Sequence, residues 1–301
     1  MTARAVAPTS PPSSSKLVTK ALTPVDSHGS VDRPFSSETL TPEQIAALKE
    51  QERRNRDQGA AEYREGQFYG KGPFQLHAEN RAYLRHLALA PGERLLDAGA
   101  GVGRLALLVA PRVQQLVCVD LSTGCLDILK SEATARGLRN IETQPGDLCR
   151  LPGSLGVFDA AYSVEVVDHI PSDCERLAAV KKLHDLLRPG GRCLVSVHCW
   201  NPRSRRSGVE REGFWGTGER RLYHHYFTTG ELRDLLCRAG FRSVRLRGLN
   251  ILPGRITRSL PASLARLEVG CSMVPALAGI GSLVIGMGTR QVGPGESFRG
   301  E

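Results

Sequence analysis

The sequence predicts an α/β fold, in which a mostly parallel sheet carries helices on both of its faces. Between residues 90 and 290, short apolar runs alternate with amphipathic segments, as parallel strands joined by crossover helices do. Strands are expected at about 94–98, 115–120, 140–144, 158–163, 191–197, 241–248 and 282–288. Helices are expected to begin near Gly103, Gly124, Asp173 and Thr229. A chain of 301 residues, 41% of them hydrophobic, can bury the core of one such domain.

The two ends of the chain differ from this domain. Residues 1–40 are rich in Pro, Ser and Thr and poor in large apolar side chains, so we expect a disordered tail. Its first 25 residues contain Arg4, Lys16 and Lys20 and no acid, a composition that organellar transit peptides share. Residues 41–89 are expected to add two helices, at about 41–57 and 76–88, and residues 291–301 a flexible tail.

Two inserts interrupt the domain. Residues 199–227 are too long for a simple connection, and we expect an irregular segment that shapes the substrate side. Residues 255–277 are expected to form a mainly helical insert before the last strand. No charged residue occurs from Val269 to Thr289, which is long enough to span a bilayer. Pro275, Gly279, Gly281, Gly286 and Gly288 there favour a buried helix followed by a strand, so we expect no membrane span, although peripheral membrane contact stays open.

Composition excludes little by itself. The formal charge of +9 would suit nucleic acid if the basic residues clustered, but they are dispersed, so nucleic acid is the weaker expectation. The eight cysteines contain no CxxC pair and mostly lie in apolar stretches, which indicates reduced, buried thiols and no metal site. A reducing compartment such as the cytoplasm is therefore expected, with an organelle as the alternative if the tail is a transit peptide. The sequence does not predict the oligomeric state.

A glycine-rich turn follows the first strand of the domain. The strand ends at Asp97-Ala98 and continues as Gly99-Ala100-Gly101-Val102-Gly103-Arg104, where glycines let the backbone turn tightly and approach a ligand. The dinucleotide fingerprint GxGxxG requires glycine where Arg104 stands, which disfavours NAD. Asp97 would repel a pyrophosphate but would attract an ammonium group. The turn therefore favours a cationic cofactor without phosphate over an unliganded strand-to-helix turn.

Two more carboxylates follow the next strands. Asp120 lies about 20 residues beyond the turn, where the ribose hydroxyls of an adenosyl group would lie, with Leu121 beside the adenine. Asp120 could equally cap the following helix. Asp147 follows the third strand and could accept from the adenine amino group, with Leu148 offering a backbone donor. Because Asp147 also follows a glycine, it could instead be an ordinary turn residue.

These motifs, with Phe158-Asp159-Ala160-Ala161-Tyr162-Ser163 and Leu187-Arg188-Pro189-Gly190-Gly191, resemble the ordered motifs of class I, or Rossmann-like, S-adenosylmethionine-dependent methyltransferases. The resemblance covers roughly residues 90–197 and is nearest to the group acting on quinones and other small molecules. It implies a seven-stranded sheet whose last strand is antiparallel. It maps cofactor binding to Asp97, Gly99, Ala100, Gly101, Gly103, Asp120, Leu121, Asp147 and Leu148, with Ser163 facing the same cleft. It also suggests Tyr69 in a cofactor lid and Arg81 at the methionine carboxylate.

The candidate bases are four histidines, His169, His198, His224 and His225, because imidazole titrates near neutral pH. A base is needed only if the acceptor must lose a proton, since a sulfonium methyl is already activated. His169 resembles a histidine common in quinone-type C-methyltransferases, though a structural role is also open. His198 ends the fifth strand and faces the cleft by position. His225 lies in the aromatic run 223–227, which could line the acceptor pocket or cover the sheet edge.

The acceptor is the least certain part of the prediction. The apolar stretch near residues 260–277 favours a small, apolar or lipid-like acceptor that is methylated on O, N or C, with S-adenosylhomocysteine as co-product. Against this, residues 221–227 resemble a segment of methyltransferases that act on the wobble uridine of tRNA, and the chain is basic. A catalytically idle methyltransferase-like partner protein is the third reading. The intact Asp97, Asp120 and Asp147 argue against that last reading.

Overall fold

The central element is a seven-stranded sheet in the order β3-β2-β1-β4-β5-β9-β8, and the computed structural model describes residues 36–64, 71–216 and 220–291. The strands are β1 (Arg94–Ala98), β2 (Gln115–Asp120), β3 (Ile141–Pro145), β4 (Phe158–Val164), β5 (Leu187–His198), β8 (Arg242–Leu249) and β9 (Leu283–Thr289). Strands β1 to β5 pair in parallel, whereas β9 runs antiparallel to both β5 and β8. The predicted α/β sheet with an antiparallel last strand is confirmed.

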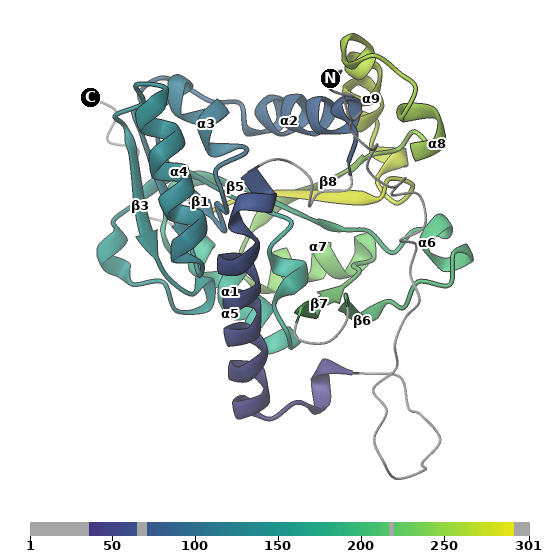
Figure 1. Ribbon diagram of the computed structural model, residues 1–301, viewed down its shortest axis with the longest axis horizontal. Coiled ribbons are helices and arrows are strands. Elements are labelled where there is room, and N and C mark those ends of the chain that lie inside the picture. The colour runs from purple at the N-terminus through teal and green to yellow at the C-terminus, as the bar shows by residue number, and fades with distance from the viewer. Residues whose placement is uncertain (1–35, 65–70, 217–219, 292–301) are drawn as a thin grey trace, which may run out of the picture.

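Helices cover both faces of this sheet. They are α1 (Pro42–Arg64), α2 (Pro73–Leu87), α3 (Ala106–Val109), α4 (Thr123–Ala135), α5 (Asp173–Asp185), α6 (Pro202–Arg206), α7 (Thr229–Arg238), α8 (Gly254–Thr257) and α9 (Ala265–Ser272). Figure 1 shows α2 and α3 on one side of the sheet and α5 and α7 on the other. One core cluster joins the sheet to α2, α3 and α4, and a second joins it to α5 and α7. The sheet is therefore buried on both faces.

The positions of the central strands could be predicted because these strands are buried on both faces. Leu95 and Leu96 on β1 point to opposite faces, and both are fully buried. A strand covered on both faces is apolar at its centre, so its apolar run marks its position in the sequence. The boundaries of β1 and β2 accordingly agree with the predicted ranges.

Two helices differ from expectation near the glycine turn. The helix expected near Gly103 begins only at Ala106 and spans four residues, because Gly103 has a φ of +87°, which cannot start a right-handed helix. Helix α1 continues to Arg64, beyond the predicted end near residue 57. Its extra turns contain Ala60, which packs against Val102 and Cys125. Tertiary packing thus extends α1 where the sequence offers no clear stop.

The two inserts carry more regular structure than their sequences indicate. Residues 199–227 were expected to be irregular, yet they contain α6 and a two-stranded antiparallel hairpin of β6 (Glu212–Trp215) and β7 (Leu222–His225). Between β8 and β9 lie α8 and α9, in the segment expected to be mainly helical. The burial expected from residue 269 onward is wrong in part, because Met273 and Val274 are 38% and 44% exposed. Within the described residues, no helix combines the length and apolarity needed to cross a membrane.

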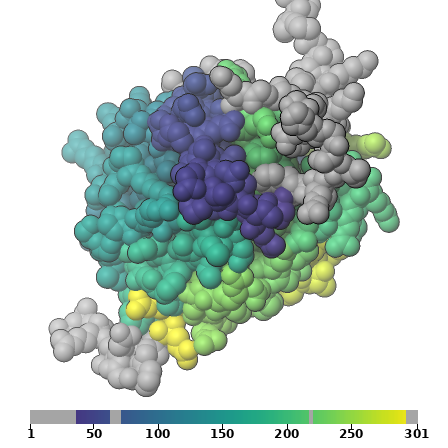
Figure 2. Space-filling view, turned by 90° about the horizontal axis from the view of Figure 1, so that it is seen from below, coloured from purple at the N-terminus to yellow at the C-terminus, as the bar shows by residue number. Residues whose placement is uncertain are grey.

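Helix α1 lies across the carboxyl ends of the strands, and Figure 2 shows it on the molecular surface between the domain's first and second halves. Its Asp57 Oδ1 accepts from the Ser122 hydroxyl at 2.6 Å and from the Gly124 N–H at 3.0 Å, at the start of α4. Asn55 donates to the Arg221 carbonyl next to β7 at 2.9 Å. Just before α1, Ser37 donates its N–H to Glu212 on β6 at 3.2 Å, so residues 36–40 form a docked turn where a tail was expected.

Candidate active site

A cavity opens at the carboxyl ends of β1, β2, β4 and β5, beneath α1. Parallel α/β sheets bind ligands at this edge, where the loops after neighbouring strands converge. The lining includes most residues that the sequence singled out: Asp97, Gly99, Ala100, Gly101, Asp120, Leu121, Asp147, Leu148, His169 and His198. The structure thus brings together side chains that are separated by up to about one hundred positions in the chain.

The glycine turn has backbone angles that side chains other than glycine rarely adopt. Gly99, Gly101 and Gly103 have φ values of +91°, +53° and +87°. Asp120 anchors the turn, because its Oδ2 accepts from the Gly101 N–H at 2.8 Å while its Oδ1 accepts from the Ser122 N–H at 2.9 Å. Asp120 therefore ties the loop after β1 to the start of α4.

Gly101 and Gly103 have different roles, and alanine substitutions should distinguish these roles. A Cβ on Gly103 would lie 2.2 Å from Leu129 Cδ1, whereas a Cβ on Gly101 would meet nothing within 4 Å. Gly103 does not line the cavity, so it permits close packing on α4. We expect Gly103→Ala to lower the free energy of unfolding by about 2–4 kcal/mol. Gly101→Ala should cost about 1–2 kcal/mol of backbone strain and mainly weaken ligand binding, because its methyl group enters the cavity.

Thermal unfolding and ligand titration of both variants check this distinction. If Gly103→Ala melted at the temperature of the unmodified chain while Gly101→Ala unfolded, the assigned roles would be reversed.

Asp97 is a buried carboxylate at the floor of the cavity. It is 4% exposed, and its Oδ2 accepts a hydrogen bond from the Tyr162 hydroxyl at 2.8 Å. Burial raises the pKa of Asp97 to about 7, and the nearby Asp120 adds to that effect. Near neutral pH such a carboxyl group is only partly ionised. A cationic partner lowers its pKa and so favours the ionised form. Asp97 is therefore suited to bind an ammonium group.

Asp147 already has a cationic partner from the helix above it. Its Oδ2 accepts from Lys49 Nζ on α1 at 2.9 Å, and Lys49 also contacts Glu175 on α5. Although burial alone would raise the pKa of Asp147, the bond to Lys49 holds it below its usual value. Asp147, Cys149 and Glu175 place three potential metal-ligand atoms within 4.8 Å of one another, but Lys49 and Arg150 each pair with both carboxylates. Lys49 therefore links helix α1 to the side of the cavity that contains Asp147.

A network of alternating charges forms the next wall. Lys71 Nζ lies 2.7 Å from Glu165 Oε2 and 3.0 Å from Glu79 Oε1, and Arg104 contacts both acids. Glu79 is completely buried and also accepts from Asn250 at 2.7 Å. Glu165 has a φ of +56°, an unusual angle for a residue other than glycine, and such strain concentrates at functional sites. Lys71 and Arg104 offer positive charge to an anionic group in the cavity.

His198 and Asp168 form a hydrogen-bonded pair on the other side of the cavity. His198 Nδ1 contacts the fully buried Asp168 carboxylate, which also accepts the His198 N–H at 3.2 Å. Because the Nδ1 position faces a carboxylate, the neutral ring keeps its proton there and leaves Nε2 as the acceptor. Nε2 lies 4.0 Å from Glu165 Oε2. Burial alone would lower the pKa of His198, but Asp168 and Glu165 raise it above its usual value.

Aromatic rings surround this pair. Trp215 on β6 stands edge-on to His198, with ring centroids 5.0 Å apart, and stacks on His224 at 4.7 Å. His169 Nδ1 donates to the Tyr223 carbonyl at 2.8 Å, and its ring lies 5.4 Å from Trp215. The β6–β7 hairpin therefore supplies an apolar wall beside a titratable ring, which suits an aromatic ligand.

Several predicted site residues lie elsewhere. Arg81 is exposed, because α2 turns Ala78, Glu79 and Ala82 inward and residue 81 outward. Ser163 is fully buried and does not line the cavity, because strand alternation directs Tyr162 and Val164 there instead. Tyr69 falls outside the described residues.

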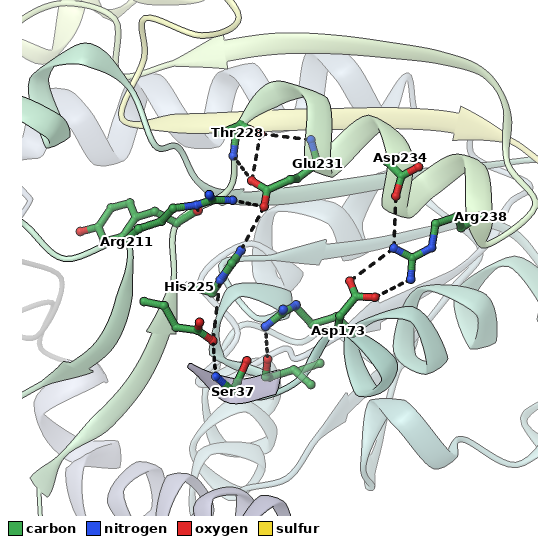
Figure 3. Close-up of polar contacts among 12 residues, drawn as sticks. Ser37, Asp173, Arg211, His225, Thr228, Glu231, Asp234 and Arg238 are labelled. Atoms are coloured by element: carbon green, nitrogen blue, oxygen red, sulfur yellow. Dashed lines mark hydrogen bonds and ion pairs between the residues drawn. The ribbon is translucent and has the colours of Figure 1, made fainter. Parts of the chain in front are cut away.

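His225 also lies outside this cavity. Figure 3 shows it between Glu231 at the start of α7 and Ser37, and its Nδ1 lies 3.9 Å from Glu212 Oε1. Desolvation lowers the pKa of His225 to about 4, and the nearby Arg176 adds to this effect. The ring therefore belongs to a polar cluster that joins the hairpin to the segment before α1.

Other cavity residues were missed by sequence reasoning. Lys71, Glu165 and Trp215 line the cavity, and Asp168 lies behind His198. The four residues come from three separate segments, and none of them stands in a motif that indicates its role. Glu165 did carry one usable signal, since it follows the end of the fourth strand directly, where cleft residues are common.

Comparison with known proteins agrees with this geometry. A family described as a methyltransferase domain matches residues 95–191. The chain is 31% identical over 165 residues to the ubiquinone biosynthesis O-methyltransferase of Ruegeria pomeroyi, covering 54% of this chain and 65% of that protein. The protein of the same name from Dinoroseobacter shibae is 32% identical over 182 residues, covering 60% of this chain and 72% of that protein. The chain thus spans slightly less than two thirds of the first relative and more of the second.

A solved structure shows the same fold. A SAM-dependent methyltransferase from Thermotoga maritima superimposes with a TM-score of 0.56 at 19% identity, covering 79% of this chain and 99% of that chain. At this identity the likeness concerns the fold alone. The overall fold is therefore shared with that structure.

Proposed function

The chain belongs to the class I S-adenosylmethionine-dependent methyltransferase family, and from that membership we propose that it methylates a hydroxyl group of a small aromatic, lipid-like acceptor. The observation that carries the proposal is the hydrogen-bonded pair of His198 and Asp168 beside the Trp215 ring. A phenolic hydroxyl has a pKa near 10, so a base is needed to ionise it at neutral pH.

The cavity fits the family's cofactor. Asp97 would hold the ammonium of the methionine part, Asp120 the ribose hydroxyls and Asp147 the adenine edge, while Lys71 or Arg104 would face the carboxylate. The open space at Gly101 leaves room for close backbone approach. S-adenosylmethionine, when bound, supplies a methyl group activated by a positively charged sulfur. The residues of this chain therefore need only align the acceptor and remove its proton.

His198 is the proposed proton acceptor. Its Nε2 carries the free lone pair, and Asp168 stabilises the imidazolium that forms when the acceptor hydroxyl gives up its proton. Glu165 lies close enough to stabilise the same positive charge. His169 is the weaker candidate, because its Nδ1 is bonded to the Tyr223 carbonyl and no carboxylate hydrogen bond is described for it.

The names of the relatives support oxygen as the methylated atom. Both are ubiquinone biosynthesis O-methyltransferases. The apolar lining on the same side of the cavity, from Val164, Val166, Ile170, Trp215 and Leu222, supports an aromatic acceptor over a highly charged one.

An alkyl-substituted catechol and the matching alkyl aniline test the proposal. We expect methyl transfer from S-adenosylmethionine to the catechol oxygen, detected by mass spectrometry, and at least tenfold slower transfer to the amine. The reason is that His198 activates the hydroxyl by removing its proton, whereas the neutral amine gains no reactivity from the base. Preferential methylation of the amine or of ring carbon would contradict O-methylation.

A further inference from the structure

The insert between β8 and β9 exposes an unusual set of apolar side chains. Among the described residues, six large hydrophobic side chains are strongly exposed, and five of them lie in residues 252–280. These five are Ile256, Leu267, Met273, Val274 and Ile280, with exposed fractions of 52%, 53%, 38%, 44% and 40%. Soluble proteins usually keep exposed apolar residues scattered, so their concentration in one insert indicates a contact surface. We call residues 252–280 the insert surface.

The exposed charges of the insert surface are all positive. Arg255, Arg258 and Arg266 are exposed, and within the described part of the chain none of them forms an ion pair. The insert's one acid, Glu268, is 1% exposed and accepts the N–H groups of Ile251 at 2.6 Å and Leu252 at 3.0 Å. Glu268 is thus used inside the fold to hold the insert, and it leaves the outer face of the insert without an acidic group.

Helix α6 adds further positive charge beside the insert. Its N-cap Asn201 donates to the Gly281 carbonyl at 2.6 Å, and Arg203 donates to the Ile251 carbonyl, so α6 is tied to both ends of the insert. Arg205 and Arg206 on the same helix are exposed. Figure 1 shows α6, α8 and α9 gathered at one end of the molecule. The two elements therefore present arginines at the same end of the molecule as the exposed apolar side chains.

We propose that the insert surface, together with α6, docks on an anionic phospholipid bilayer. Apolar side chains would enter the boundary between headgroups and acyl chains, and the arginines would contact lipid phosphates, as interfacial amphipathic segments do. A second copy of the chain fits less well, because a two-fold interface would bring the same arginines face to face without exposed acids of the insert to pair them. The inference does not depend on the acceptor proposed above.

Vesicle sedimentation of the full-length protein tests this proposal. We expect it to pellet with vesicles that mix phosphatidylglycerol into phosphatidylcholine, to bind phosphatidylcholine alone weakly, and to lose binding as salt increases. Each arginine near such a surface contributes about fivefold in affinity, so removing three should weaken binding roughly 100-fold. That variant is Arg255→Gln with Arg258→Gln and Arg266→Gln. A second variant, Ile256→Ser with Leu267→Ser and Val274→Ser, should bind weakly even at low salt.

A matched control removes similar groups elsewhere on the surface. Val157→Ser with Arg112→Gln and Arg139→Gln changes exposed residues outside the insert and should bind like the unmodified chain. Unchanged melting and unchanged S-adenosylmethionine binding establish that each variant is folded. The proposal is overturned if the unmodified chain stays in the supernatant or if the insert variants pellet as well as the control. It is also overturned if light scattering shows a stable dimer that the serine variant separates.

Discussion

Replacing His198 by alanine is expected to lower kcat for methyl transfer to a phenolic acceptor about 10²- to 10⁴-fold, because the acceptor loses its base. The affinity for S-adenosylmethionine should change little, since His198 lies on the acceptor side of the cavity. Steady-state kinetics with a phenolic acceptor and titration calorimetry with the cofactor measure the two effects separately. The matched control is His225→Ala, which also removes a buried imidazole but outside the cavity, and it should keep most of the activity.

The pH dependence gives the same prediction a sharper form. His198 must be neutral to accept a proton, so kcat/KM should fall as the pH drops through its pKa, which Asp168 and Glu165 raise above 6.5. Asp168→Asn removes one of these charges, so the acidic limb should move to lower pH while the maximal rate falls. An acidic limb that stays in place in Asp168→Asn, or full activity in His198→Ala, would show that another group takes the proton.

The second large effect is expected at Asp97. Below pH 7 the buried carboxyl is largely protonated in the free protein, so binding an ammonium group should release a proton. Cofactor affinity should therefore increase as the pH rises toward 7, by up to about tenfold per unit. Asp97→Asn should weaken binding roughly 10- to 100-fold at pH 8, because a charged hydrogen-bond partner is lost. Calorimetry across a pH series measures both quantities.

Folding provides the control for this variant. The pKa of Asp97 is raised from 3.8 to about 7 in the folded chain, so its ionisation destabilises the fold as the pH rises through that window. At pH 8, Asp97→Asn should consequently unfold at a higher temperature than the unmodified chain, although it binds the cofactor less tightly. Exposed Asp127→Asn should change neither property. Cofactor affinity that does not vary with pH would argue against Asp97 as the ammonium ligand.

Much of the cofactor half of the site could be predicted because its determinants are local. The strand from Leu95, the glycine turn and Asp120 form one strand-loop-helix unit, so spacing along the chain reports position in space. The positions of buried parallel strands can also be predicted from their apolar runs. The role of Gly103 could not be predicted in this way. From the sequence alone, a glycine that leaves space for a ligand looks the same as one that leaves space for a packed side chain, here Leu129.

The acceptor half depends on contacts between distant segments. Asp168 pairs with His198 across thirty positions, and Trp215 reaches them from a hairpin whose strands are only four residues long. Arg81 was misplaced for a similar reason, since the face of α2 that turns inward is determined by Glu79 and its buried partners. Helix α1 extended past its expected end because Ala60 packs onto α4 and the glycine turn. These features follow from tertiary packing, which a single sequence does not display.

The most direct test of the central claim is methyl transfer from labelled S-adenosylmethionine to cell extract separated into lipid and RNA fractions. A small, lipid-like acceptor predicts label in the lipid fraction as an O-methyl group, and predicts its loss when His198→Ala replaces the unmodified chain. Label in the RNA fraction, or equal labelling of lipid by both proteins, would contradict the account.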